Sequence, residues 1–293
     1  MSQEKFFYGG QAVIEGVLMR GRTTYAVAVR RPDGEIEVRR EALTSVVYTS
    51  RFWKLPLLRG LAGLWEMLHL EMKALVWSAN VQARSQDIEL TPRQIAITMG
   101  IAIVGAIAFF LGLPLLAAGL FSRGGSALTF TVIEGLVRIG LLLLYLYLIS
   151  LNPEVRRVFQ YHGAEHKTIN GYEAGLPDDV ANVRTQSTLH PRCGTGFLLA
   201  VMVVSVFVFS LAGRPALPLL ILSRLVLVPL IAMLAYEFIR FAGRHRYNPV
   251  VKVLLVPFLA TQKLTTREPE DRQIEVALAA FRAARLEEKE AAA

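Results

Sequence analysis

The sequence predicts a mainly α-helical, polytopic membrane protein with four transmembrane helices, interfacial helices and a small N-terminal β-hairpin. Of its 293 residues, 53% are hydrophobic, and the mean hydropathy of +0.41 is high for a soluble protein of this size. The apolar residues gather in runs that can cross a bilayer as helices, which takes about 20 residues. The net charge is +8, and the lysines and arginines are spread unevenly around the apolar runs, as expected beside an anionic inner leaflet.

Residues 1–50 are expected to form a cytoplasmic segment. The stretch Tyr8–Val17, Tyr-Gly-Gly-Gln-Ala-Val-Ile-Glu-Gly-Val, is punctuated by glycine and suits a tight loop or a short strand. Alternating runs at 24–31 and 35–40 flank Pro-Asp-Gly, which predicts a β-hairpin.

Residues 51–90 are expected to form amphipathic helices that lie on the membrane surface. Leucines recur at helical spacing along one face, and all three tryptophans of the chain, Trp53, Trp65 and Trp77, fall in this stretch. Tryptophan favours the boundary between membrane and water, because its ring is buried there while its N–H stays hydrated. This composition favours interfacial helices over the alternative, a core helix of a soluble domain.

Two apolar hairpins, at 91–151 and 196–241, carry the four predicted spans. The spans lie at about 95–121, 127–151, 196–211 and 217–241. The links inside each hairpin are only a few residues long, so the two spans of a hairpin are antiparallel neighbours. Lysines and arginines collect on the other side, in the N-terminal region, the segment 152–195 and the C-terminal region. The positive-inside rule then places both termini and the segment 152–195 on the cytoplasmic face of the inner membrane.

Residues 242–293 are expected to contain a re-entrant or interfacial segment followed by a C-terminal amphipathic helix. Val250–Leu259 is apolar but too short to cross a bilayer. Thr265–Pro269 is typical of a helix start, and Gln273–Lys289 carries apolar residues at helical spacing.

Three charged residues, Glu134, Arg138 and Arg224, fall inside the predicted spans. Glu134 and Arg224 lie at equal depth in the second and fourth spans, and Arg138 follows Glu134 by one helical turn. Because charges at such a depth are costly unless they are paired, we expect Glu134 to bridge both arginines as a tie between neighbouring helices. An ion or proton route is the functional alternative, and Arg224 alone could instead reach the outer headgroups.

The segment 152–195 is expected to hold a cytoplasmic metal site. His162 and His166 stand four residues apart, so on a helix they share one face and can hold one metal ion. With Glu165 they form the order His-x-x-Glu-His of the inverted zinc peptidases, in which the glutamate is the general base. His190 and Cys193, the only cysteine of the chain, are the expected third and fourth ligands of a divalent metal, with zinc as the expected ion. The alternative is a polar loop that binds no metal.

Two further carboxylates could join this site. Glu173 returns to the histidine face but lies about 10 Å further along the axis than His166, so it could join only if the helix breaks at Gly171. Glu15, in the glycine-rich stretch, could reach the site or be a structural carboxylate of a turn.

Cys193 also has the surroundings of a nucleophile. It precedes a predicted helix and follows Arg192, and both features lower the pKa of a thiol. His190 or His162 would then be its base. A single cysteine forms no internal disulfide, which fits a reducing compartment.

Four stretches of the chain resemble a bacterial membrane family called domain of unknown function 1385. They are Tyr8–Val17, Phe159–Thr168, His190–Gly194 and Leu264–Pro269. The resemblance runs from about residue 8 to residue 286 and implies an integral membrane protein that is a metal-dependent enzyme, with no substrate named. Leu18 and Gly196 stand where the family pattern leads us to expect Met and Ser, and Gly196 therefore receives no catalytic role.

The expected activity is metal-assisted hydrolysis of a membrane-associated substrate, a peptide or a lipid, at the cytoplasmic face, with Glu165 as base. The alternatives are a membrane scaffold or assembly factor with a structural metal, and a Cys193-dependent enzyme. Four protein ligands would favour the structural metal, whereas an open coordination position would favour the enzyme. A transporter is disfavoured because the polar cluster lies outside the spans, and nucleic acid because no binding module is recognisable. The lipid bilayer is the partner that the sequence implies.

Overall fold

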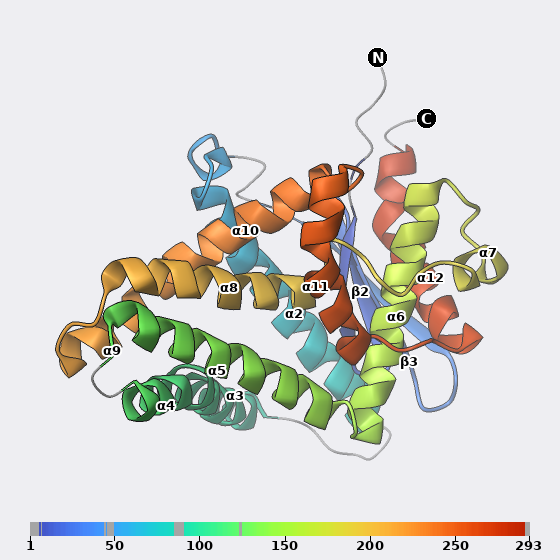
Figure 1. Ribbon diagram of the computed structural model, residues 1–293. Coiled ribbons are helices and arrows are strands. Elements are labelled where there is room, and N and C mark those ends of the chain that lie inside the picture. The colour runs from blue at the N-terminus through green and yellow to red at the C-terminus, as the bar shows by residue number, and fades with distance from the viewer. Residues whose placement is uncertain are drawn as a thin grey trace.

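The computed structural model describes residue 6, residues 8–43, residue 45, and residues 50–84, 91–122 and 125–290, with only the backbone of Pro92 and of the last five of these. A bundle of apolar helices lies on one side, and a small sheet covered by helices lies on the other (Figure 1). The described part is mainly helical, as the sequence predicts.

The N-terminal sheet has four antiparallel strands in the order β1-β2-β3-β4. The strands are β1 (Gly9–Val13), β2 (Gly16–Arg20), β3 (Thr24–Arg30) and β4 (Ile36–Ala42). β3 and β4 are the predicted hairpin. β1 and β2 come from the glycine-rich stretch, so the sheet is twice the predicted size. Of the two structures expected for this stretch, a tight loop or a short strand, strands are formed, although glycine is depleted in strands and two consecutive glycines begin β1.

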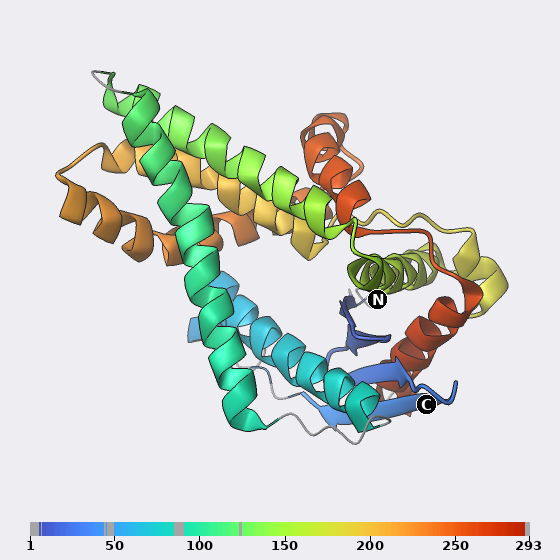
Figure 2. The ribbon, with the colours of Figure 1, turned by 90° about the horizontal axis from the view of Figure 1, so that it is seen from below.

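The sheet is the middle of three layers (Figure 2). One face of the sheet, which includes Ala26 and Ala28 of β3, shares a hydrophobic core with α6 (Pro153–Ala174), α7 (Val180–Arg184) and α12 (Asp271–Glu290). The other face packs against α2 (Leu58–Ala83), which follows a short 3-10 turn, η1 (Phe52–Lys54). The alternation of small and large side chains along β3 thus separates two cores.

α2 is one continuous helix with two apolar stripes. Leu70, Ala74 and Val81 are buried against the sheet, whereas Leu68 and Trp65 are exposed, Trp65 by 73%. An exposed tryptophan and leucine stripe suits contact with the membrane surface. The interfacial placement of this segment stays a prediction.

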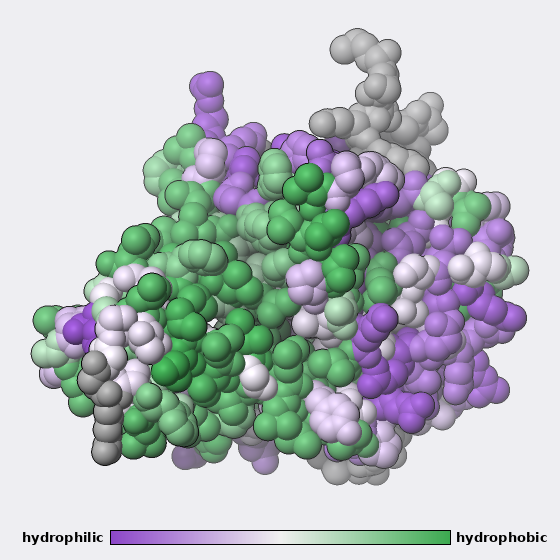
Figure 3. Space-filling model, in the orientation of Figure 1, coloured by the Kyte–Doolittle hydropathy of each residue, from purple (hydrophilic) through white to green (hydrophobic). Residues whose placement is uncertain are grey.

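Four helical stretches are long and apolar enough to cross a membrane: Arg93–Phe121, Ala127–Ile149, Gly194–Ala212 and Leu217–Arg244. They agree with the four predicted spans, imply a lipid bilayer as surroundings, and suggest a multi-pass membrane protein. On the face seen in Figure 3, the surface is apolar over the candidate spans and polar over α6, α7 and α12.

Two of the spans are not regular helices. The first consists of α3 (Pro92–Ile107), a π-helical segment η3 (Ala108–Gly112) and α4 (Leu113–Phe121). The second is α5 (Ala127–Ile149) and the third is α8 (Gly194–Ala212). The fourth is divided at Leu227 into α9 (Leu217–Val226) and α10 (Val228–Arg244).

The expected re-entrant or interfacial segment is a full helix, α11 (Pro249–Thr265). Val250 and Val253 are exposed, whereas Phe258 and Gln262 are buried near α8. α11 lies across the ends of α5 and α8 (Figure 1). The C-terminal helix, Asp271–Glu290, includes the expected Gln273–Lys289, but Thr265–Pro269 is not a helix start: Thr265 ends α11 and residues 266–270 are not helical.

The orientation in the membrane can be tested by thiol labelling in a Cys193→Ala background. Ala127→Cys places a thiol at the start of α5, Ala216→Cys places one in the link before α9, and Ala181→Cys places one on α7. All three positions are exposed. The positive-inside rule predicts that an impermeant maleimide labels the first two in intact cells, and labels position 181 only after permeabilisation. The reverse pattern would put the helices that cover the sheet outside the cell.

Candidate metal centre

α6 is built to run without interruption through both histidines. The Asn152 side chain accepts hydrogen bonds from the backbone N–H of Glu154 and Val155, and Pro153 opens the first turn. Gly175, with φ of 77°, ends the helix in the left-handed conformation. His162 and His166 therefore lie on one face, one turn apart, with ring centroids separated by 4.4 Å.

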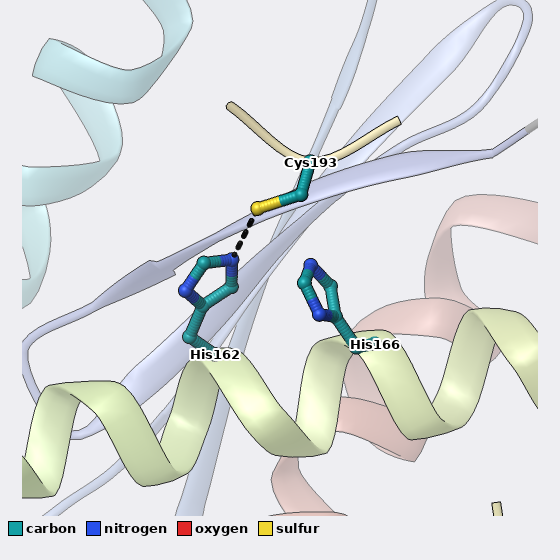
Figure 4. Close-up of side chains that lie close together, drawn as sticks. All are labelled: His162, His166 and Cys193. Atoms are coloured by element: carbon teal, nitrogen blue, oxygen red, sulfur yellow. Dashed lines mark hydrogen bonds between the residues drawn. The ribbon is translucent and has the colours of Figure 1, made fainter. Parts of the chain in front are cut away.

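Cys193 meets the histidine pair from a different element. It is the N-cap of α8, and its Sγ lies 3.3 Å from Nε2 of His162. Ligand atoms of His162, His166 and Cys193 all lie within 4.8 Å of one another. Figure 4 shows the thiol aimed at the space above the two rings. The structure thus brings together three of the four expected metal ligands.

The two imidazoles are held through Nδ1, so that Nε2 of each remains available as a metal ligand. Nδ1 of His162 donates to the carbonyl of Thr265 at 2.9 Å, and Nδ1 of His166 donates to the carbonyl of Thr188 at 2.6 Å. A carbonyl can only accept, so these contacts fix the tautomer in which Nε2 carries a lone pair. Metal-binding histidines are commonly oriented in this way. Histidines, thiol and orientation together fit a transition-metal ion such as zinc.

Glu165 lies beside the two histidines. Its Oε2 is 3.5 Å from Nε2 of His166 and 3.9 Å from Nε2 of His162. Burial raises the pKa of Glu165 to about 7, and nearby His162 and Arg192 offset this effect only in part. The carboxylate is thus placed to exchange a proton near neutral pH.

The glycine-rich stretch reaches the centre through Gly10. A Cβ on Gly10 would lie 2.7 Å from Cγ of Glu165 and 2.7 Å from the carbonyl of Leu18. Only glycine lets β1 approach Glu165 this closely.

Glu15, which the sequence allowed either to reach the site or to be a turn carboxylate, binds Arg157 and accepts a hydrogen bond from the Tyr161 hydroxyl at 3.2 Å. These contacts match the structural alternative, a turn carboxylate that fastens the β1–β2 hairpin to α6.

His190 is not part of the three-residue group. Its ring is 5.6 Å from that of His166, and the Gln262 side chain holds its backbone N–H and carbonyl at 2.9 and 2.8 Å. Its Nε2 is buried without a hydrogen-bond partner, 3.7 Å from Oε1 of Glu173. Burial lowers the pKa of His190 to about 4, so the ring is neutral at physiological pH.

Glu173 also stays outside the group, because α6 does not break at Gly171. It forms ion pairs with Arg192 and, at 2.7 Å, with Arg246. Burial would raise the pKa of Glu173, but contacts with His190 and these two arginines hold it well below its usual range. Glu173 therefore anchors the chain before α8 to the end of α6.

Glu71 is a second carboxylate near the centre that sequence reasoning missed. It is partly buried on α2, and burial together with the charge of Glu165 raises its pKa to about 7. A glutamate on an amphipathic helix ordinarily lies on the solvated face, so nothing in the pattern around Glu71 points to a site.

The raised pKa of Glu71 predicts a pH-dependent effect of Glu71→Gln. The folded protein binds the proton up to about pH 7, whereas the unfolded chain releases it near the ordinary glutamate pKa of 4.5. Ionised Glu71 thus weakens folding increasingly as pH rises from 4.5 through 7. We expect Glu71→Gln to be more stable than the native protein by about 1–3 kcal/mol at pH 8 and nearly equal at pH 5. Thermal unfolding in detergent at both values measures this, with exposed Glu154→Gln as control. An equal effect of Glu71→Gln at the two values would contradict the assignment.

The charged residues inside the spans form one buried cluster. Glu134 accepts from Arg138 at 2.5 Å and from Arg224 at 2.6 Å, so the predicted bridge is confirmed. Arg138 also donates to the Ser205 hydroxyl at 2.9 Å, and both guanidiniums lie over the ring of Phe209. The cluster ties α5 to α8 and α9.

Comparison with known proteins confirms the family resemblance. A family model described as "Protein of unknown function (DUF1385)" matches residues 55–287, so the glycine-rich stretch lies outside the matched range. The chain is similar to "Uncharacterized protein YqhQ" of Bacillus subtilis (strain 168), with 36% identity over 288 residues that cover 94% of this chain and 91% of the relative. No solved structure matches.

Proposed function

The chain belongs to the DUF1385 family of membrane proteins, and we propose that it is a metal-dependent hydrolase of a membrane-associated peptide or lipid. One observation carries the proposal: His162, His166 and Cys193 converge as three donors within 4.8 Å of one another. Among the described residues, the Glu165 carboxylate lies beside them, with Oε2 3.5 and 3.9 Å from the two histidine Nε2 atoms, but it is not a member of this group. A four-coordinate zinc held by three protein ligands keeps one position open, which is the arrangement of catalytic rather than structural zinc.

The donors also favour zinc among the possible ions. Two imidazole nitrogens and one thiolate suit a borderline-soft ion, whereas magnesium and calcium prefer oxygen ligands. When bound, such an ion lowers the pKa of a water molecule and polarises a carbonyl or phosphoryl oxygen.

The residues of the chain supply orientation and proton transfer. Thr265 and Thr188 fix the two imidazoles through their carbonyls, so the rings need no rearrangement to present Nε2. Glu165 is the proposed general base, because its carboxylate is within 4 Å of both Nε2 atoms. His166 and Cys193 are buried while His162 is partly exposed, so a substrate would approach from the His162 side.

The position of the centre supports a substrate from the membrane. Cys193 directly precedes α8, the third candidate span, and Thr265 is the last residue of α11, whose other end exposes valines. The reacting group therefore lies at the boundary between the apolar helices and the polar layers. The positive-inside rule favours the cytoplasmic side for this boundary.

The second candidate is an enzyme that uses Cys193 as its nucleophile, because Sγ of Cys193 lies 3.3 Å from Nε2 of His162. That is a nucleophile and base at hydrogen-bonding distance. This candidate predicts activity that survives removal of metal and is lost on alkylation of Cys193. The hydrolase predicts that chelation removes activity and that zinc restores it.

The proposed function is tested with a Glu165→Gln variant in cells that lack the native gene. Loss of the base should leave metal bound while the substrate accumulates, so the membrane lipids and peptides should match those of the His162→Ala/His166→Ala variant and differ from wild type. A species that accumulates should then be cleaved by purified, zinc-loaded wild-type protein. If Glu165→Gln with full metal content restores the wild-type profile, Glu165 is not the base of a hydrolase.

A further inference from the structure

We propose that a second site, separate from the metal centre, binds the phosphate group of an anionic phospholipid. The end of α5, the start of α6 and the end of α11 converge (Figure 1). Between them lies an open pocket of about 400 Å³ lined by Tyr147, Ser150, Leu151, Arg156, Leu264 and Arg267. This pocket is called the headgroup pocket below.

The headgroup pocket has an unbalanced positive charge. Its lining contains two guanidiniums and no carboxylate. Among the described residues, neither Arg156 nor Arg267 forms an ion pair, whereas neighbouring Arg157 is paired with Glu15. Nη1 of Arg267 donates to the carbonyl of Thr266 at 3.0 Å, which holds the side chain at the pocket. Two arginines that face one cavity suit a phosphate, because a guanidinium binds its oxygens with two parallel hydrogen bonds.

The surroundings of the headgroup pocket favour a lipid over free phosphate. Tyr147 and Leu151 lie at the end of the second candidate span and are exposed by 52% and 61%. An exposed apolar wall beside a charged pocket would contact acyl chains while the arginines hold the headgroup. Basic pockets at the ends of transmembrane helices recognise anionic lipids in this way. The volume also lies within the range of small-ligand sites, about 300–1,000 Å³.

The headgroup pocket shares one segment with the metal centre. Leu264 and Arg267 line the pocket, and between them the carbonyl of Thr265 accepts the hydrogen bond from His162. A bound headgroup would therefore steady the segment that orients one metal ligand. Lipid binding does not depend on hydrolysis and can be measured without turnover.

The test measures binding of dioctanoyl phosphatidylglycerol to the full-length protein in neutral detergent by native mass spectrometry. We expect one bound molecule and an affinity about tenfold or more higher than that for dioctanoyl phosphatidylcholine or inorganic phosphate. Arg156→Gln/Arg267→Gln should weaken binding of phosphatidylglycerol by about tenfold or more, and Arg156→Lys/Arg267→Lys should retain part of it.

Arg244→Gln is the matched control, because Arg244 is an exposed arginine at the end of another span, outside the pocket. It should bind the lipid as wild type does. Unchanged melting temperature and metal content would show that the double glutamine variant is folded. If that variant unfolds, the comparison of lipid affinity between the double lysine variant and Arg244→Gln decides whether the pocket binds the lipid. Equal loss in Arg244→Gln would reduce the effect to general surface charge and overturn the pocket. Binding of inorganic phosphate as tight as that of phosphatidylglycerol would overturn the lipid, and undiminished lipid binding by the double glutamine variant would overturn the site.

Discussion

A His162→Ala/His166→Ala variant is expected to contain no metal, whereas the native protein contains about one zinc ion per chain. Two of the three converging donors are removed, and the Cys193 thiolate alone cannot hold an ion against water. Elemental analysis of protein purified in detergent without chelators measures the difference. The loss should be nearly complete, because a tetrahedral site with one remaining protein ligand retains little of its affinity.

The chain supplies a matched control for this experiment. His69 and His245 lie outside the metal group, so His69→Ala/His245→Ala removes the same number of histidines and should keep the metal. His190→Ala should also keep it, because His190 is held by Gln262 outside the group. Native protein that contains no transition metal would contradict the site itself. Metal lost from His190→Ala would instead restore the four-ligand, structural interpretation.

The membrane architecture could be predicted from the sequence because it depends on local composition. A run of apolar residues becomes a span wherever it occurs, and the four predicted spans agree with the four candidate helices to within a few residues at most ends. The pairing of His162 with His166 was equally local, since helical periodicity alone places them on one face.

The rest of the centre depends on contacts between distant segments, which periodicity does not encode. Cys193 joins the histidines because α8 begins beside α6. The backbone of His190, three residues earlier, is instead held by Gln262 of α11, and its ring lies near Glu173. Gly10 gave no chemical signal of its own, yet its missing Cβ lets β1 approach Glu165. These positions follow from packing among α6, α11 and the sheet.

The buried cluster shows that a long-range contact can be predicted when the physical penalty is large enough. A charge deep in a bilayer needs a partner of opposite charge, and Arg224 lies at the same depth as Glu134, which made it an expected partner. The geometry adds what depth could not indicate: Ser205 of α8 also binds Arg138, and Arg138 donates to the carbonyl of Phe110 in the π-helical segment of the first span at 3.0 Å. One carboxylate therefore organises charged groups that contact all four spans.

Glu134→Gln is expected to lower the free energy of unfolding by about 3–5 kcal/mol, because it leaves two buried guanidiniums without a counterion. Adding Arg224→Leu should recover part of this loss, since it removes one of the unpaired charges and keeps an apolar side chain against Phe209. Glu154→Gln, which changes an exposed glutamate in the first turn of α6, should have little effect.

Thermal unfolding in detergent measures all three variants, with a fall of roughly 5–15 °C expected for Glu134→Gln. A Glu134→Gln protein as stable as Glu154→Gln would show that the cluster contributes no net stability.

Proton or ion flux in proteoliposomes distinguishes a structural tie between helices from a path that conducts ions or protons. Among the described residues of the spans, Glu134, Arg138 and Arg224 form the buried ionisable cluster, and no further buried charge continues a route from it. Flux should therefore be the same for wild type and Glu134→Gln, and a flux that Glu134→Gln abolishes would favour the path.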